Sequence, residues 1–184
     1  MTDTTSSETR VPNPRGISRE KAPEPSISDR PIRGERYWSQ DFAQLEWERL
    51  WPRMWQVAGR VDQIPNAGDY VTYDIGRDSI IAVRGDDARI RAFYNVCQHR
   101  GNQLVTSEVG ALSSGEFQCA YHGWRFATTG ECTWVHDEDD FPQGSPCGRR
   151  NLVAIPCDTW GGFIWFNMDP TCDDLRTWLS PVAD

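Results

Sequence analysis

The chain has 184 residues, a formal net charge of −8 and an isoelectric point near 4.9. This length allows one domain with a buried core, and the acidic balance excludes the basic surface typical of nucleic-acid-binding proteins. No apolar run approaches the roughly 18 residues that span a bilayer, and the N-terminus lacks the apolar core of a secretory signal. We therefore expect a cytoplasmic protein without a nucleic-acid or membrane partner, whose six cysteines are metal ligands or free thiols.

The first 36 residues differ in composition from the remainder of the chain. They contain no aromatic residue, five prolines and many Ser and Thr. Such a segment cannot bury enough apolar surface to offset its chain entropy. We predict that residues 1–36 form a disordered tail.

Residues 37–54 predict a helical lead-in. The stretch SQDFAQLEWERLW begins with Ser39, a suitable N-cap, and Pro52 is expected to end or kink the helix after Trp51. Apolar side chains recur at helical spacing and predict one stripe that packs against the following domain. Its members are Ala43, Trp47, Leu50, Trp51 and Met54.

From residue 55 onward the pattern changes to short strands. Runs rich in β-branched and aromatic residues alternate with turn signals, without an internal repeat or βαβ alternation. The expected strands lie within 55–61, 69–75, 79–85, 90–96, 116–121, 124–128 and 131–135, with two more in 151–168. An acidic loop, 136–148, interrupts them. The fold class we predict is mainly β, an antiparallel sheet domain with an N-terminal helix.

Two short motifs combine cysteine and histidine. The first reads Cys97-x-His99 and, after nineteen intervening residues, the second reads Cys119-x-x-His122. Each motif follows a strand-like run, and each is followed within two residues by a glycine, Gly101 or Gly123. Glycine allows the positive φ or close backbone approach that a loop around a metal centre needs. We expect both loops to converge on one site.

The spacing of these four ligands discriminates between metals. Zinc accepts two Cys and two His, but common zinc sites pair Cys with Cys and His with His. In a Rieske [2Fe–2S] centre two Cys hold one iron and two His hold the other, so each of two loops supplies one Cys and one His. The paired motifs favour the Rieske centre, and a structural zinc domain is the less favoured alternative.

The sequence resembles a known family from Tyr37 to the C-terminus. The stretches FYNVCQHRGNQLV, FQCAYHGWRFATTGEC and GGFIWFNMDP are similar to the N-terminal part of the large (α) subunit of Rieske non-haem iron ring-hydroxylating oxygenases. This resemblance implies that Cys97 and Cys119 bind the inner iron of one Rieske [2Fe–2S] cluster. It also implies that His99 and His122 bind the outer iron, nearer solvent.

The resemblance also implies an organisation and a role. Residues 55–170 would form the Rieske domain, and 171–184 a linker or the start of a catalytic domain. Single electrons would pass from a reductase or ferredoxin to a mononuclear Fe(II) that activates O₂, within a ring-shaped homo-oligomer. That iron needs two His and one carboxylate, and only His136 remains outside the two motifs. We therefore expect no catalytic residue in this chain, a mononuclear iron only beyond it, and an ordinary loop position for His136.

Other positions refine the expected class of Rieske centre. Respiratory Rieske proteins carry a disulfide between the two loops, and Asn102 and Tyr121 occupy the corresponding places here. With neutral His in place of thiolate, we expect a midpoint potential on the order of −150 mV, at the low end of the Rieske range. Trp124 and Tyr121 are expected to pack over the cluster, and ordinary core packing is the alternative. The remaining cysteines are expected to be structural or incidental: Cys132, Cys147, Cys157 and Cys172.

A second function fits the same motifs. A stand-alone Rieske ferredoxin would also transfer single electrons without catalysing a reaction. The helical lead-in at 37–54 and the GGFIWFNMDP stretch instead favour an oxygenase subunit.

Overall fold

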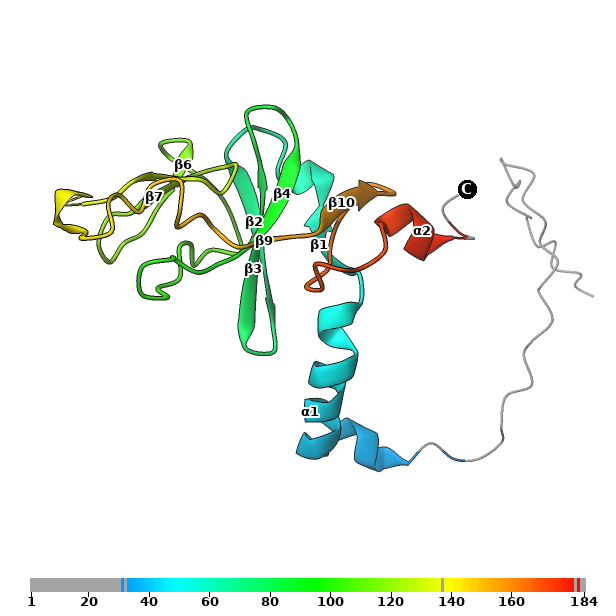
Figure 1. The fold of residues 1–184 in the computed structure, drawn as a ribbon. Helices are drawn as coiled ribbons and strands as arrows, with labels where there is room; N and C mark the ends of the chain where they lie inside the picture. Colours follow the sequence, from blue (N-terminus) through cyan, green and yellow to red (C-terminus); the bar gives the residue numbers. More distant parts are fainter. Residues whose placement is uncertain (1–30, 32, 137, 181, 183–184) are drawn as a thin grey trace, which may run out of the picture.

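The computed structural model describes residues 31, 33–136, 138–180 and 182 (Figure 1). The helical elements are η1 (Gly34–Tyr37), α1 (Gln40–Arg49), η2 (Trp51–Arg53), η3 (Val61–Gln63), η4 (Glu138–Asp140) and α2 (Leu175–Leu179). The strands are β1 (Gln56–Arg60), β2 (Asp69–Ile75), β3 (Asp78–Arg84), β4 (Ile90–Tyr94), β5 (Val109–Ala111), β6 (Glu116–Gln118), β7 (Arg125–Ala127), β8 (Cys132–Trp134), β9 (Ala154–Ile155), β10 (Cys157–Trp160) and β11 (Phe163–Phe166). Strands dominate, which confirms the predicted fold class. The tail predicted for 1–36 lies outside the described residues, apart from residues 31 and 33–36.

The strands form three antiparallel sheets. A five-stranded sheet, β5-β2-β3-β4-β9, occupies the middle of the molecule, and β6-β7-β8 forms a separate lobe (Figure 1). The third sheet, β1-β11-β10, joins the first strand to the last two, beside α2. Two strand predictions were wrong: residues 151–168 contain three strands, and β5 was not expected. Strand β5 has three residues and none of them is buried, so the sequence carries no apolar run there; in the structure it pairs with β2.

Strand β3 is buried on both faces of the central sheet. Ile80 and Ala82 point into one core, whereas Ile81 and Val83 point into the other, as the two-residue period of a strand requires. All four side chains have 0% exposure. The core that contains Ile81 and Val83 extends to the lobe and includes cysteines of both motifs. The central sheet is therefore the base on which the candidate site rests.

Helix α1 begins as predicted but packs less than predicted. The Ser39 hydroxyl accepts a hydrogen bond from the backbone N–H of Phe42 at 3.2 Å, and the chain turns into η2 at Pro52. No residue of α1 is buried, because the helix projects away from the sheets (Figure 1). Trp47 lies over Gly76, where a Cβ atom would come within 2.4 Å of its ring. The remainder of the predicted stripe does not form one buried face, and Trp51 is 40% exposed.

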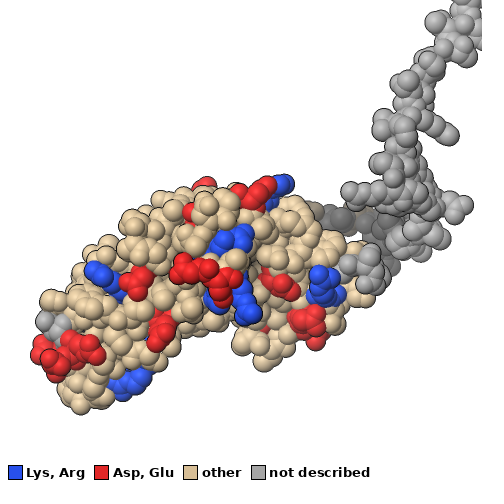
Figure 2. All heavy atoms as spheres, turned by 90° about the horizontal axis from the view of Figure 1, so that it is seen from above, with Lys and Arg blue, Asp and Glu red and all other residues tan. Residues whose placement is uncertain are grey.

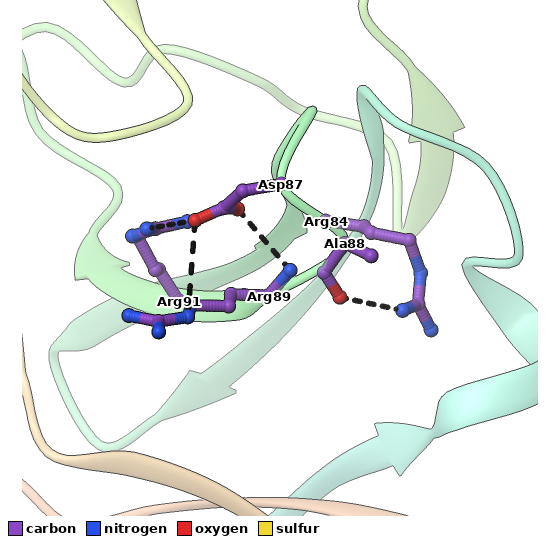
Figure 3. A network of polar contacts seen from close by, with 5 residues as sticks. All are labelled: Arg84, Asp87, Ala88, Arg89 and Arg91. Carbon is purple, nitrogen blue, oxygen red and sulfur yellow. Dashed lines mark hydrogen bonds and ion pairs between the residues drawn. The ribbon is translucent and has the colours of Figure 1, made fainter.

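The turn between β3 and β4 is held by side chains (Figure 3). Asp87 accepts hydrogen bonds from both Arg91 guanidinium NH₂ groups, at 2.9 and 2.7 Å, and from the backbone N–H of Arg89 at 3.2 Å. Arg84 donates to the carbonyl of Ala88 at 2.9 Å, which supports a residue with a φ of 62°. These bonds stabilise the hairpin turn at the beginning of β4, whereas the first Cys–His motif follows the end of that strand.

None of the helices in the described part of the chain has the length and apolar character that a membrane span requires.

Candidate metal centre

Each Cys–His motif forms a compact loop, which we call loop 1 (residues 97–102) and loop 2 (residues 119–124). In loop 1 the backbone N–H of Cys97 donates to the carbonyl of Asn102 at 2.8 Å. The N–H of Gly101 donates to the carbonyl of Cys97 at 3.0 Å. Gly101 has a φ of 74°, a backbone conformation that costs free energy for residues with a Cβ atom.

Loop 2 repeats this closure position by position. The N–H of Cys119 donates to the carbonyl of Trp124, and the N–H of Gly123 to the carbonyl of Cys119, both at 2.9 Å. Gly123 has a φ of 71°. The His stands two positions after Cys97 but three positions after Cys119. The two loops therefore share one backbone frame although their ligand spacing differs.

Asn95, a residue that no sequence motif singled out, closes the base of the segment that contains loop 1. Its side-chain oxygen accepts hydrogen bonds from the backbone N–H groups of Leu104 and Val105, at 3.0 and 3.1 Å. Its amide nitrogen donates to the carbonyl of Val105 at 2.7 Å and to the Ser79 hydroxyl at 3.1 Å. Asn95 is 4% exposed, and its partners lie 9 to 16 residues away in the sequence, so no local pattern marks this position.

The two motif cysteines lie deep in the protein and next to each other. Cys97 is 2% exposed and Cys119 is 3% exposed. Burial, with the neighbouring Cys119 thiol, raises the pKa of Cys97 to about 11. Two adjacent buried thiolates would be unstable without a cation, and metal coordination is what removes the proton from such a thiol. This pair therefore fits a metal better than it fits two free thiols.

The two motif histidines lie nearer the surface. His122 is exposed and His99 is half-buried, with their ring centroids 4.7 Å apart. The Nδ1 atom of His99 is buried and has no hydrogen-bond partner. Burial lowers the pKa of His99, and the nearby His122 and Arg100 lower it further. A neutral ring with an unpartnered buried nitrogen is the form in which imidazole binds a metal.

Aromatic side chains cover both histidines. The Trp124 ring stacks on His99 with centroids 4.8 Å apart and planes 4° apart. Phe141 meets the Trp124 ring edge-on at 6.0 Å. Tyr121 lies against His122 at 3.8 Å, between ring centroids. Trp124 and Tyr121 thus contact the two histidine rings, and their packing over a cluster stays a prediction.

The site borders a cavity of about 490 Å³ that opens beside His99. Its lining combines Trp124 and Phe141 with polar and basic groups, including Gln98, Arg149 and Arg150. Basic side chains therefore line the cavity beside His99. The acidic element η4 directly precedes Phe141 in the sequence. Figure 2 shows an acidic patch at the left end of the molecule, where the β6-β7-β8 lobe lies.

The four motif side chains form two pairs, one of thiols and one of imidazoles. Among the described residues, no three His, Cys, Asp or Glu side chains are grouped closely enough to hold one ion. A pair of thiols and a pair of imidazoles match the ligand set of a binuclear Rieske centre, in which each iron takes two protein ligands. The third histidine, His136, is exposed, with its ring centroid 6.0 Å from that of Trp134.

The other cysteines differ partly from expectation. Cys132 is buried as expected, at 1% exposure, whereas Cys157 is only half-buried. Burial raises the pKa of Cys132 to about 12, and the adjacent Cys147 thiol adds to this shift. The thiols of Cys132 and Cys147 therefore lie next to each other, and the structural or incidental role expected for them stays a prediction. Their sequence separation concealed the contact, which the hydrogen bond from the N–H of Gly148 to the carbonyl of Cys132 at 3.2 Å supports.

Comparison with known proteins identifies this arrangement. Residues 54–146 match the model of the Rieske [2Fe–2S] domain family. The α subunit of benzene 1,2-dioxygenase from Pseudomonas putida is 35% identical over 149 residues, covering 78% of this chain and 31% of that protein. The oxygenase subunit of carnitine monooxygenase from Escherichia coli K12 is 33% identical over 143 residues, covering 78% and 37%.

Solved structures agree with the sequence relatives. A quaternary ammonium Rieske monooxygenase superposes with a TM-score of 0.74 at 27% identity, over 81% of this chain and 43% of that chain. Naphthalene 1,2-dioxygenase from Rhodococcus sp. gives a TM-score of 0.70 at 30% identity, over 76% and 32%. The chain spans about a third of the length of the curated relatives and matches the N-terminal part of oxygenase α subunits. The chain therefore belongs to the Rieske [2Fe–2S] domain family.

Proposed function

We propose that loops 1 and 2 hold the [2Fe–2S] cluster with Cys97 and Cys119 on the inner iron and His99 and His122 on the outer iron. The observation that supports this assignment is the order of depth: two adjacent buried thiols lie beneath two neighbouring imidazoles. The unpartnered Nδ1 atom of His99 supplies a free lone pair at that depth. The backbone hydrogen bonds that close the two loops match, so each loop presents one Cys and one His in a similar frame.

We infer that the chain serves electron transfer. A bound cluster of this type supplies one-electron chemistry. The protein contributes the route and the environment: exposed His122 marks the side from which an electron enters or leaves. The Trp124 ring covers one face of the His99 ring, and Phe141 packs against Trp124. Low polarity around the ligands and hydrogen bonds to them set the potential, which we place on the order of −150 mV.

We propose that the full-length protein is an O₂-dependent Rieske oxygenase that hydroxylates an aromatic or other organic substrate. The relatives include benzene and biphenyl dioxygenases, and also carnitine and methanesulfonate monooxygenases. A reductase or ferredoxin would supply single electrons. The mononuclear Fe(II) site that receives the electrons would lie beyond this chain. The chain has three histidines, and two of them are assigned to the cluster, so too few remain for a site that needs two. A homo-oligomer would bring the donor centre of one subunit to the iron of the next.

The proposal is tested by loading the chain with iron and sulfide and measuring its metal content, visible absorption and EPR spectrum. Two irons per chain, colour, and an EPR signal after one-electron reduction are expected. A colourless, EPR-silent protein that contains zinc would overturn the ligand assignment. A midpoint potential above about +100 mV would contradict the proposed low-potential environment. Sequencing the coding region beyond position 184 tests the oxygenase assignment: a domain with two His and one carboxylate supports it, and a stop codon with no such neighbouring gene favours a ferredoxin.

A further inference from the structure

One position in each loop reaches across to a ligand of the other loop. This position is the fifth after the cysteine, Asn102 in loop 1 and Trp124 in loop 2. In both loops its carbonyl accepts the hydrogen bond from the cysteine N–H that closes the loop, at 2.8 and 2.9 Å. The backbone of each residue is therefore fixed relative to its own cysteine, which leaves its side chain available for the opposite loop.

Asn102 directs its side chain toward loop 2. Its Nδ2 atom lies 3.8 Å from the Sγ atom of Cys119 and 2.7 Å from the carbonyl of Gln103. The bond to the Gln103 carbonyl orients the carboxamide and leaves its second N–H for the sulfur. The contact joins a half-buried amide to a thiol that is 3% exposed, so little water competes for it.

Trp124 makes the reciprocal contact. Its ring is 3% exposed and stacks in parallel on His99, with centroids 4.8 Å apart. The edge of Phe141 contacts the same ring, so the indole is confined on more than one side. Loop 2 therefore fixes the plane of the loop 1 imidazole, including the direction of its unpartnered Nδ1 atom.

We propose that Asn102 and Trp124 are positioning residues that brace loops 1 and 2 reciprocally, and that the Asn102 N–H···S contact also raises the reduction potential of the cluster. This proposal rests on the ligand set proposed above. Reduction adds negative charge to the cluster and its thiolates, and an N–H dipole aimed at a ligand sulfur stabilises that charge. Loss of the Asn102 N–H···S contact should therefore favour the oxidised state of the cluster.

The test for Asn102 compares Asn102→Leu with Gln103→Leu in the iron-loaded chain. Both changes replace a side chain that ends in a carboxamide by the isobutyl side chain of Leu, in the same segment. Among the described residues, the Gln103 side-chain amide donates only to the Ser79 hydroxyl, at 3.4 Å. For Asn102→Leu we expect the reduced-to-oxidised equilibrium constant to fall about threefold to tenfold, the effect of one ordinary hydrogen bond. Faster iron release to a chelator is also expected. Gln103→Leu should match the wild type in both measurements.

A second comparison addresses Trp124 and guards against a variant that fails to fold. Trp124→Phe keeps a ring that can stack on His99, whereas Trp124→Leu does not, and Trp178→Leu is a control on α2, where the native ring is 40% exposed. We expect iron release to be fastest in Trp124→Leu, intermediate in Trp124→Phe, and unchanged in the control. If Trp124→Leu does not fold, Trp124→Phe must still release iron faster than the wild type.

Failure of the brace and failure of the ligand set give different results. A wild-type chain without a Rieske EPR signal would refute the ligand assignment itself. A normal wild-type signal, with the potential and iron release of Asn102→Leu equal to those of Gln103→Leu, would refute the role of Asn102. Equal iron release in the Trp124 and Trp178 variants would refute the role of Trp124.

Discussion

The positive φ angles at Gly101 and Gly123 make a direct prediction about the metal centre. Each glycine donates the hydrogen bond that closes its loop on the ligand cysteine, with φ angles of 74° and 71°. Replacing either glycine by alanine keeps this N–H but imposes a Cβ on a left-handed conformation. The perturbation therefore acts on the backbone of the loop and leaves every proposed ligand in place.

The magnitude follows from the space around each glycine. A Cβ at Gly101 would meet no atom closer than 3.9 Å, and one at Gly123 would lie 3.4 Å from the ring of Trp134. Neither distance is a clash, so the cost is that of the left-handed backbone, about 1–2 kcal/mol. This corresponds to a factor of about 5–30 in the equilibrium between the closed loop and alternatives.

Gly148 supplies a matched control. It also has a φ of 71°, and a Cβ there would meet nothing within 4 Å. Urea unfolding should show a similar loss of stability for Gly101→Ala, Gly123→Ala and Gly148→Ala. Only the first two should lose iron, measured as iron per chain after loading and as the rate of release to a chelator. Gly101→Asn should recover part of the loss, because Asn tolerates positive φ better than Ala.

Two outcomes would refute this reasoning. If Gly101→Ala and Gly123→Ala retain iron as well as the wild type, the closure of the loops does not position the ligands. If Gly148→Ala loses as much iron as they do, the effect is one of general stability and not of the loops.

Replacing His122 with Cys should retain a cluster but lower its midpoint potential, because a thiolate adds negative charge; an unchanged spectrum and potential would show that His122 is not a ligand. Gly130→Ala should lower the free energy of unfolding in urea by about 2–5 kcal/mol, because its Cβ would lie 2.5 Å from the buried Phe93 ring at a φ of 88°. The hydrogen bond from Arg91 holds the pKa of Asp87 below its ordinary value of 3.8. This carboxylate therefore stabilises the fold above that pH, and its contribution is lost as the pH falls toward the depressed value. Asp87→Asn should flatten the acid limb of the stability curve, and an unchanged limb would contradict this.

Local patterns in the sequence were enough to identify several elements and the chemistry of the site. The alternation in residues 69–75 predicted β2 with its bounds, and Ser39 predicted the start of α1, because both depend on neighbours within one element. The Cys–His spacing indicated a Rieske centre, since the number and order of ligand types constrain the metal before any coordinate is known.

Contacts between distant residues required the tertiary structure. The stacking of Trp124 on His99, the contact of Asn102 with Cys119, and the hydrogen bonds of Asn95 join positions that no local period relates. The sequence by itself therefore determined the family of the metal centre and most of the strand segments, although β5 and one strand within 151–168 escaped it. Only the tertiary structure decided how deep each ligand lies, what braces it, and how little of α1 is buried, because burial and side-chain contacts depend on how separate elements pack.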